Sequence, residues 1–195
     1  NKDLKKAKLP AKLVKYLRKQ RKTKFPLLIF ASEIKKGQEI REVLQKYFPE
    51  ETQRKPFFYH SIRVWVFLWN QWYSEEIQIA GLLHDTLEDT SISEKEIENL
   101  FWKNVVWIVK ANSKNLSLAK EEVLEDIVKR CSDYGIDAMI VKVADVYDNF
   151  LFYKKINNIP EIERCKKLSN LILKYKKDYN DKIFNFLEEI ISFEA

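Results

Sequence analysis

Apolar residues recur at spacings of three and four along most of the chain, which is the period of helices that bury one face. The clearest runs are the segment that follows Ser61, residues 75–85, residues 136–153 and the stretch after Pro160, which predicts one long helix or two. Only three glycines and five prolines interrupt 195 residues. This scarcity argues against hairpins with frequent turn residues, and we expect an all-α protein.

Helix starts are visible at two serines. Ser93 followed by Glu96 forms a capping box, which predicts a helix through Phe101. Ser117 is predicted to begin another helix that runs to about Arg130. In the first quarter of the chain, the pattern predicts helices over residues 9–17, 27–35 and 39–48.

Large aromatic and small residues suggest where helices pack. A stripe of tryptophans at i, i+4 and i+7 marks one helical face, and we expect it to pack in the core. It consists of Trp65, Trp69 and Trp72. Gly81, inside a predicted helix, indicates a close helix–helix approach.

Composition limits the class of protein. A length of 195 residues fits one domain with a real core, and 46% hydrophobic with 33% charged residues is unlike a disordered or a membrane protein. We expect one domain over 1–195, with a basic helical segment at 1–24 and a helical extension at 160–195. Two cysteines exclude a disulfide framework and a Cys-rich zinc site. With no signal peptide or membrane span apparent, we expect a cytoplasmic location.

Positive charge is concentrated at the start of the chain. Residues 1–24 hold eleven Lys or Arg against one acid, Asp3, so the remainder is net negative although the whole chain carries +6. Such a segment suits RNA or another nucleic acid, an anionic surface, or simple solvation.

Candidate chemistry gathers around the chain's two histidines, His60 and His84. Residues 80–90 read AGLLHDTLEDT, which places Asp85 and Asp89 four residues apart at the end of an apolar helix. Like charges at this spacing repel. A divalent metal held by imidazole and carboxylate groups would relieve the repulsion, and Mn, Fe or Zn suit this ligand set. The alternative is that His84 and Asp85 merely cap a helix.

A third acidic position lies in an apolar run. Asp145 stands between Val143, Ala144 and Val146, and a buried aspartate there needs a partner. Otherwise, it shares a polar stripe with Asp148.

These strings resemble the HD metal-dependent phosphohydrolase superfamily, whose ligands are H, HD and D on a helical bundle. Within it, RKPFFYH (54–60), AGLLHDTLEDT (80–90) and VKVADVYDN (141–149) are similar to motifs of the RelA/SpoT hydrolase domain and of stand-alone small alarmone hydrolases. The resemblance covers about residues 39–155. The acidic pair after HD sets this branch apart from other HD proteins.

The resemblance implies a single-domain HD-type bundle that removes the 3′-pyrophosphate of guanosine tetra- and pentaphosphate, with Mn²⁺ as the metal. It implies metal ligands at His60, His84, Asp85 and Asp145. Glu88 and Asp89 would orient or deprotonate the attacking water. Substrate contacts would come from basic residues, which an acidic site needs to admit a polyanion, and from one amide: Arg54, Lys55, Lys142 and Asn149.

Departures from the family pattern lie at positions expected to line the substrate-binding site, here called the substrate wall. Ser61 stands where a proline usually follows the first histidine, Asp148 replaces the usual His or Tyr, and Leu151 replaces an arginine, with Phe152 beyond it. The loop before His60 is also short. Two alternatives therefore stay open: an HD phosphohydrolase for another nucleotide, a cofactor phosphate or a modified tRNA 3′ end, and a non-catalytic nucleotide-sensing or partner-binding module. The expected partner is a small nucleotide, with RNA binding through 1–24 and homo-oligomerisation left open.

Overall fold

The computed structural model describes residues 57–90, 92–115 and 117–194. Every regular element within these ranges is helical, which confirms the all-α prediction. In chain order the elements are α4 (Phe57–Asn70), α5 (Glu75–Leu83), α6 (Thr86–Asp89), α7 (Glu94–Leu100), α8 (Lys103–Asn112), α9 (Lys120–Tyr134), α10 (Ile136–Lys155), α11 (Ile159–Tyr175), the 3₁₀ helix η3 (Lys182–Phe184) and α12 (Asn185–Ser192). The basic segment 1–24 and the helices predicted at 9–17, 27–35 and 39–48 lie outside the described residues.

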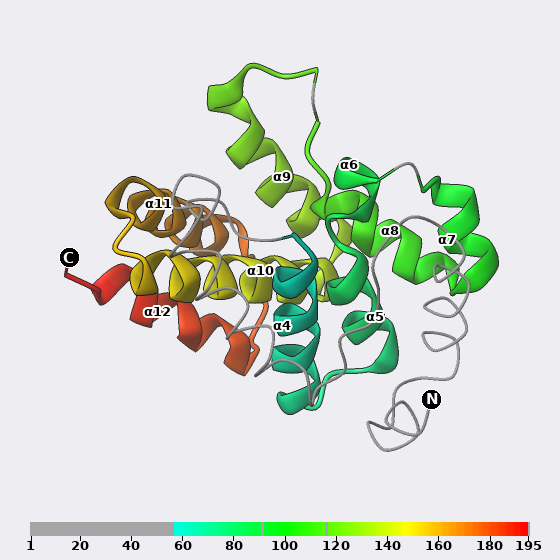
Figure 1. Cartoon of the computed structure of the whole chain (residues 1–195), viewed down its shortest axis with the longest axis horizontal. Coiled ribbons are helices and arrows are strands. Elements are labelled where there is room, and N and C mark those ends of the chain that lie inside the picture. Colours follow the sequence, from blue (N-terminus) through cyan, green and yellow to red (C-terminus); the bar gives the residue numbers. More distant parts are fainter. Residues whose placement is uncertain (1–56, 91, 116, 195) are drawn as a thin grey trace, which may run out of the picture. The chain divides into compact units, whose positions relative to one another are not determined.

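The long helix α10 runs through the middle of the compact unit His60–Ala195, and α5, α8, α9, α11 and α12 all pack against it (Figure 1). Residues 138–146 of α10 are all buried, as expected for a helix that is apolar around most of its circumference. Four polar side chains on α10 are nevertheless buried: Lys142, Asp145, Asp148 and Asn149. Because buried polar groups need partners, we expect these four side chains to interact with one another or with polar groups on neighbouring helices.

Helices α4 and α5 approach each other closely at Gly81, as the sequence predicted. A Cβ at this position would overlap Leu68 Cδ1 and would lie 3.3 Å from Val64 Cγ1. Leu68 and Val64 are fully buried on α4, so neither side chain has free space into which it can move. The contact fixes α5, whose end carries His84 and Asp85.

We expect a Gly81→Val substitution to destabilise the fold by about 1 to 3 kcal/mol, because overpacking forces buried side chains out of their preferred rotamers. Thermal unfolding of the metal-free protein measures the effect. An Ala119→Val substitution at an exposed position is the matched control. An unchanged melting temperature for Gly81→Val would show that α4 and α5 can separate without loss of stability.

Three local predictions were wrong. Ser117 does not begin a helix, because α9 starts at Lys120 with Ala119 at the N-cap position. The tryptophan stripe is not a core stripe throughout: Trp65 is buried, Trp69 is 36% exposed and Trp72, beyond the end of α4, is 88% exposed. The helix predicted to reach residue 85 ends at Leu83.

Other boundaries agree with the pattern. The capping box of Ser93 and Glu96 is present at the start of α7. After Pro160 the chain forms two α-helices, α11 and α12, and both pack against α10. None of the helices in the described part of the chain is long and apolar enough to cross a membrane.

Candidate metal centre

His84 and Asp85 lie at the junction of two helices. His84 is the C-cap residue of α5, and Asp85 occupies the N-cap position of α6 without a side-chain capping bond. The His84 ring donates from Nδ1 to the Gly81 carbonyl at 2.8 Å. That bond fixes the ring and leaves Nε2 as its free ligand atom. Both residues do lie at helix ends, His84 at the end of α5 and Asp85 at the start of α6, but their side chains have other partners.

Three helical segments bring four of the predicted residues together. His60 Nε2, from α4, lies 3.1 Å from His84 Nε2 and 3.1 Å from Asp145 Oδ1, from α10. Asp85 Oδ1 lies 3.2 Å from His84 Nε2, and its Oδ2 lies 3.7 Å from His60 Nε2. Both imidazoles are fully buried. Residues separated by up to 85 positions in sequence thus share one site.

The far sides of both rings are already occupied by hydrogen bonds. His60 Nδ1 is 2.7 Å from Asp148 Oδ2, and an ionised carboxylate can only accept, so Nδ1 is the donor. In the neutral rings, both Nε2 atoms therefore present lone pairs to each other at 3.1 Å. Two facing lone pairs repel unless a proton or a metal ion lies between them.

The electrostatics of the site favour a cation. Burial lowers the pKa of the His84 imidazole, but the carboxylates of Asp85 and Asp145 outweigh burial and raise that pKa to about 9. A buried histidine therefore keeps a proton well above neutral pH in the metal-free protein. The negative charge of Asp85 and Asp145 can be balanced by this proton or by a divalent ion.

The donor set also fits a divalent metal by type and by spacing. His60, His84 and Asp145 offer ligand atoms that all lie within 4.8 Å of one another. His60 Nε2 and His84 Nε2 lie 3.1 Å apart, which is close enough for both nitrogens to bind one ion. Two imidazoles with two carboxylates are typical of Mn, Fe and Zn sites.

Asp145 is held by two buried neighbours on its own helix. Lys142 Nζ lies 3.1 Å from Asp145 Oδ2, and Asn149 Nδ2 donates to Oδ1 at 2.7 Å. Burial lowers the pKa of the Lys142 ammonium, but the charge of Asp145 dominates and keeps the pKa above its ordinary value. Asn149 Oδ1 is buried without a hydrogen-bond partner in the structure. Both side chains thus orient Asp145.

A sequence model of the HD domain family matches residues 41–133. The matched region contains His60, His84 and Asp85, the H and HD elements of the site. The match covers 93 of the 195 residues, so just under half of this chain resembles an HD domain. Asp145 lies beyond the matched residues, and the fold brings it from α10 to the other three side chains.

Curated proteins similar to this chain include alarmone hydrolases. The guanosine-3′,5′-bis(diphosphate) 3′-pyrophosphohydrolase MESH1 of Danio rerio is 31% identical over 119 residues, which are 60% of this chain and 59% of that protein. A different relative, the competence protein ComFA of Streptococcus pneumoniae (strain ATCC BAA-255 / R6), is 59% identical over 51 residues, 26% of this chain and 12% of that protein. The chain therefore spans about three fifths of the hydrolase and about an eighth of the competence protein.

A solved structure supports the helical fold of this chain. The structure titled "A metazoan ortholog of SpoT hydrolyzes ppGpp and plays a role in starvation responses" superposes with a TM-score of 0.60 at 20% identity. The match covers 84% of this chain and 96% of that one. It identifies the HD-type helical bundle that the sequence motifs predicted.

The residues predicted to activate the water, Glu88 and Asp89, lie on the short helix α6. Glu88 is partly buried, and its carboxylate accepts hydrogen bonds from the backbone N–H of Lys114 at 2.5 Å and from Lys114 Nζ at 2.6 Å. Asp89 is exposed at the end of the same helix. The structure thus places Glu88 next to the segment that joins α8 to α9.

The predicted substrate residues divide into two groups. Arg54 and Lys55 lie outside the described residues. Lys142 and Asn149 are within them, and both contact Asp145 from inside the core.

Sequence reasoning named Asp148 only as a possible polar neighbour of Asp145 and as part of the substrate wall, and it missed Arg63 and Lys114. Arg63 and Asp148 form a pair behind His60, and Lys114 holds Glu88. The i+3 spacing of Arg63 from His60, and of Asp148 from Asp145, places each of the two on the same helical face as a proposed ligand. The Glu88–Lys114 contact joins residues 26 positions apart, and no local pattern indicates it.

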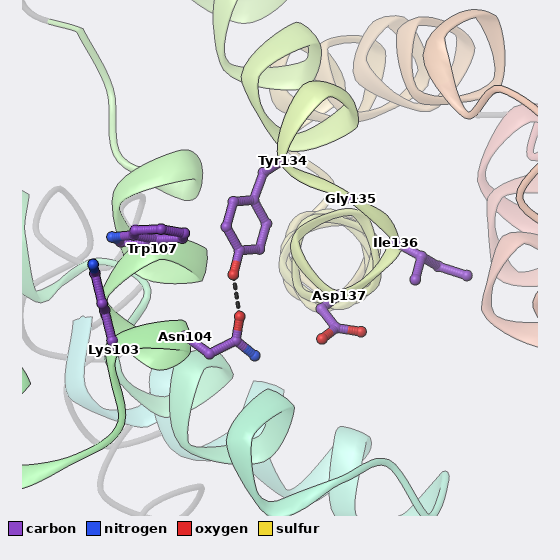
Figure 2. A pocket seen from close by; sticks show the side chains of 7 residues that line it. All are labelled: Lys103, Asn104, Trp107, Tyr134, Gly135, Ile136 and Asp137. Atoms are coloured by element: carbon purple, nitrogen blue, oxygen red, sulfur yellow. Dashed lines mark hydrogen bonds between the residues drawn. The ribbon is translucent and has the colours of Figure 1, made fainter.

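A pocket of about 450 Å³ lies apart from the His–Asp cluster, at the N-terminal end of α10 (Figure 2). Figure 2 shows Tyr134 pointing at Asn104, to which its hydroxyl donates, with Trp107 and Lys103 beside them on α8. Its lining shares no residue with the His–Asp cluster: Lys103, Asn104, Trp107, Tyr134, Gly135, Ile136 and Asp137.

Proposed function

We propose that this chain is a metal-dependent hydrolase that removes the 3′-pyrophosphate of guanosine tetra- and pentaphosphate. The observation that carries the proposal is the meeting of His60 Nε2, His84 Nε2 and Asp145 Oδ1, with Asp85 alongside, in a buried site that favours a cation. The alarmone hydrolases among the relatives support this choice of substrate.

His60, His84, Asp85 and Asp145 would hold the ion, which we propose to be Mn²⁺. When bound, such an ion lowers the pKa of a coordinated water and withdraws charge from phosphoryl oxygens. The protein keeps these ligands in position before any ion arrives. The Gly81 carbonyl orients His84, Asp148 orients His60, and Lys142 with Asn149 orients Asp145.

Glu88 and Asp89 are proposed to orient the attacking water and to take its proton. Lys114 contributes two hydrogen bonds to the Glu88 carboxylate, which restrict the directions in which it can point. Water then adds to the pyrophosphate group as its bond to the 3′ oxygen breaks. The products are GDP or GTP and pyrophosphate.

Arg54 and Lys55 are proposed to bind the substrate phosphates, which an acidic site requires. We propose that Lys142 and Asn149 affect the substrate through Asp145, since both side chains are committed to that carboxylate. A cytoplasmic location is part of the proposal. RNA binding through segment 1–24 stays an open alternative, suggested by the eleven basic residues of that segment.

The direct test is to incubate the purified protein with Mn²⁺ and guanosine tetraphosphate and to separate the products by chromatography. We expect GDP and pyrophosphate, and no turnover when EDTA is present. Orthophosphate in place of pyrophosphate would identify a different cleavage. No turnover by protein with bound Mn²⁺ would contradict the proposed substrate.

A further inference from the structure

A second charged pair lies directly behind the His–Asp cluster. Arg63 follows His60 by three residues on α4, and Asp148 follows Asp145 by three residues on α10. Residues three apart lie on the same face of a helix. The two helices therefore present the pair next to the proposed ligands, one turn along each helix.

The contacts within this pair leave Asp148 little freedom. Arg63 Nε donates to Asp148 Oδ1 at 2.7 Å, and Arg63 Nη2 donates to Oδ2 at 2.8 Å. His60 Nδ1 donates to the same Oδ2 at 2.7 Å. Asp148 is buried, and a bidentate arginine fixes both the position and the plane of its carboxylate.

Charge balance explains why an arginine accompanies the carboxylate. Asp85 and Asp145 already place negative charge around the two histidines, and a third carboxylate without a cation would add to their repulsion. An arginine can only donate hydrogen bonds, and Arg63 donates to both oxygens of Asp148. Asp148 is therefore the acceptor on both oxygens, and His60 Nδ1 donates to it.

We propose that Arg63 and Asp148 form a positioning pair that fixes the His60 ring with its proton on Nδ1, so that Nε2 is presented to the metal. The inference rests on the proposed metal site and extends it to two residues for which no motif predicted this role. Partners of this kind behind a ligand histidine set its tautomer and its basicity. In this chain the partner is an arginine-bound aspartate.

An Asp148→Asn substitution separates positioning from a structural tie between α4 and α10. With the amide oxygen in the place of Oδ1, Arg63 Nε would still hold it. The amide nitrogen would then take the place of Oδ2 and face both Arg63 Nη2 and His60 Nδ1 as a donor. His60 would have to accept at Nδ1 and carry its proton on Nε2. A hydrogen would then point at the place where the metal should bind.

We expect Mn²⁺ to bind the Asp148→Asn protein about 10- to 100-fold more weakly than the wild type, measured by titration calorimetry. In the metal-free proteins, nitrogen-15 NMR of the imidazoles should show the His60 proton on Nδ1 in the wild type and on Nε2 in the variant. The chain has two histidines, so a His84→Asn variant assigns the signals.

A double-mutant cycle tests whether Arg63 acts through Asp148. Arg63→Met alone should weaken Mn²⁺ binding, because the Asp148 carboxylate is no longer held. Added to Asp148→Asn, the same change should have little further effect. Additive losses would show that Arg63 acts by another route.

The matched control is Tyr147→Phe, next to Asp148 on α10. It removes another bond between helices, from the Tyr147 hydroxyl to Glu189 on α12 at 2.7 Å. It should lower thermal stability without changing the Mn²⁺ affinity or the His60 tautomer.

If Asp148→Asn behaves as this control does, the pair is only structural and the proposal is overturned. If the wild type binds no Mn²⁺, the proposed function fails, and the His60 tautomer still decides the role of the pair.

Discussion

An Asp85→Ala variant is expected to lose both bound Mn²⁺ and turnover, whereas a Glu88→Gln variant should keep the metal and lose turnover. Asp85 directs its two oxygens at the histidines, at 3.2 Å from His84 Nε2 and 3.7 Å from His60 Nε2. Glu88 instead contacts Lys114. Loss of a general base lowers the rate by about 10²- to 10⁴-fold, and loss of the ion removes the activated water as well.

The measurements are metal content per chain after desalting and the rate of pyrophosphate release from guanosine tetraphosphate. Glutamine at position 88 can still accept from the Lys114 backbone N–H, so the neighbouring segment should keep its place. Glu163→Gln, on the exposed side of α11, is a matched carboxylate-to-amide control that should change neither quantity. Equal metal loss in the Asp85 and Glu88 variants would refute this division of roles.

The residues of the His–Asp cluster were predictable because each lies in a recognisable local string. His84 and Asp85 follow an apolar helix, and Asp145 interrupts an apolar run, so a buried position with a compensating partner could be expected. The strings do not specify which side of each ring faces the ion. That depends on the Gly81 carbonyl and on Asp148, and the Asp148 contact joins residues 88 positions apart.

Lys142 and Asn149 make contacts with Asp145 that the motif did not predict. A lysine and an asparagine in a phosphohydrolase motif suggest contacts with phosphate and with base or ribose. The fold buries both beside Asp145, because other helices pack against α10. Their contacts depend on how α10 packs against the other helices, and the spacing of apolar residues along one helix does not reveal that packing.

Helix boundaries were predictable only where the capping residues decide them. At Ser93 the reciprocal bonds with Glu96 start α7 as expected. Ser117 offers the same type of side chain, yet α9 begins after Ala119, where no side-chain cap is made. The exposed Trp72 has a positive φ of 63° just past the end of α4, so the chain turns before the third tryptophan can reach the core.

We expect Mn²⁺ affinity to rise with pH by about tenfold per unit between pH 6.5 and 8.5. In the metal-free protein the His84 pKa is raised from 6.5 to about 9 by Asp85 and Asp145 against the opposing effect of burial. A ligand imidazole must be deprotonated, so binding below pH 9 displaces a proton from His84. Titration calorimetry in buffers of different ionisation enthalpy measures both the affinity and the released proton.

The same pKa shift reverses the pH trend of stability when the metal is removed. A histidine whose pKa is higher in the folded state stabilises the fold fully below its unfolded pKa of about 6.5, and this contribution is lost as pH rises towards 9. With EDTA present, the contribution of His84 should therefore lower the melting temperature as pH rises through this range. With Mn²⁺ present, tighter binding at higher pH should add a growing stabilisation. An affinity that stays flat from pH 6.5 to 8.5 would show that no protonated imidazole competes with the ion, and it would contradict the raised pKa of His84.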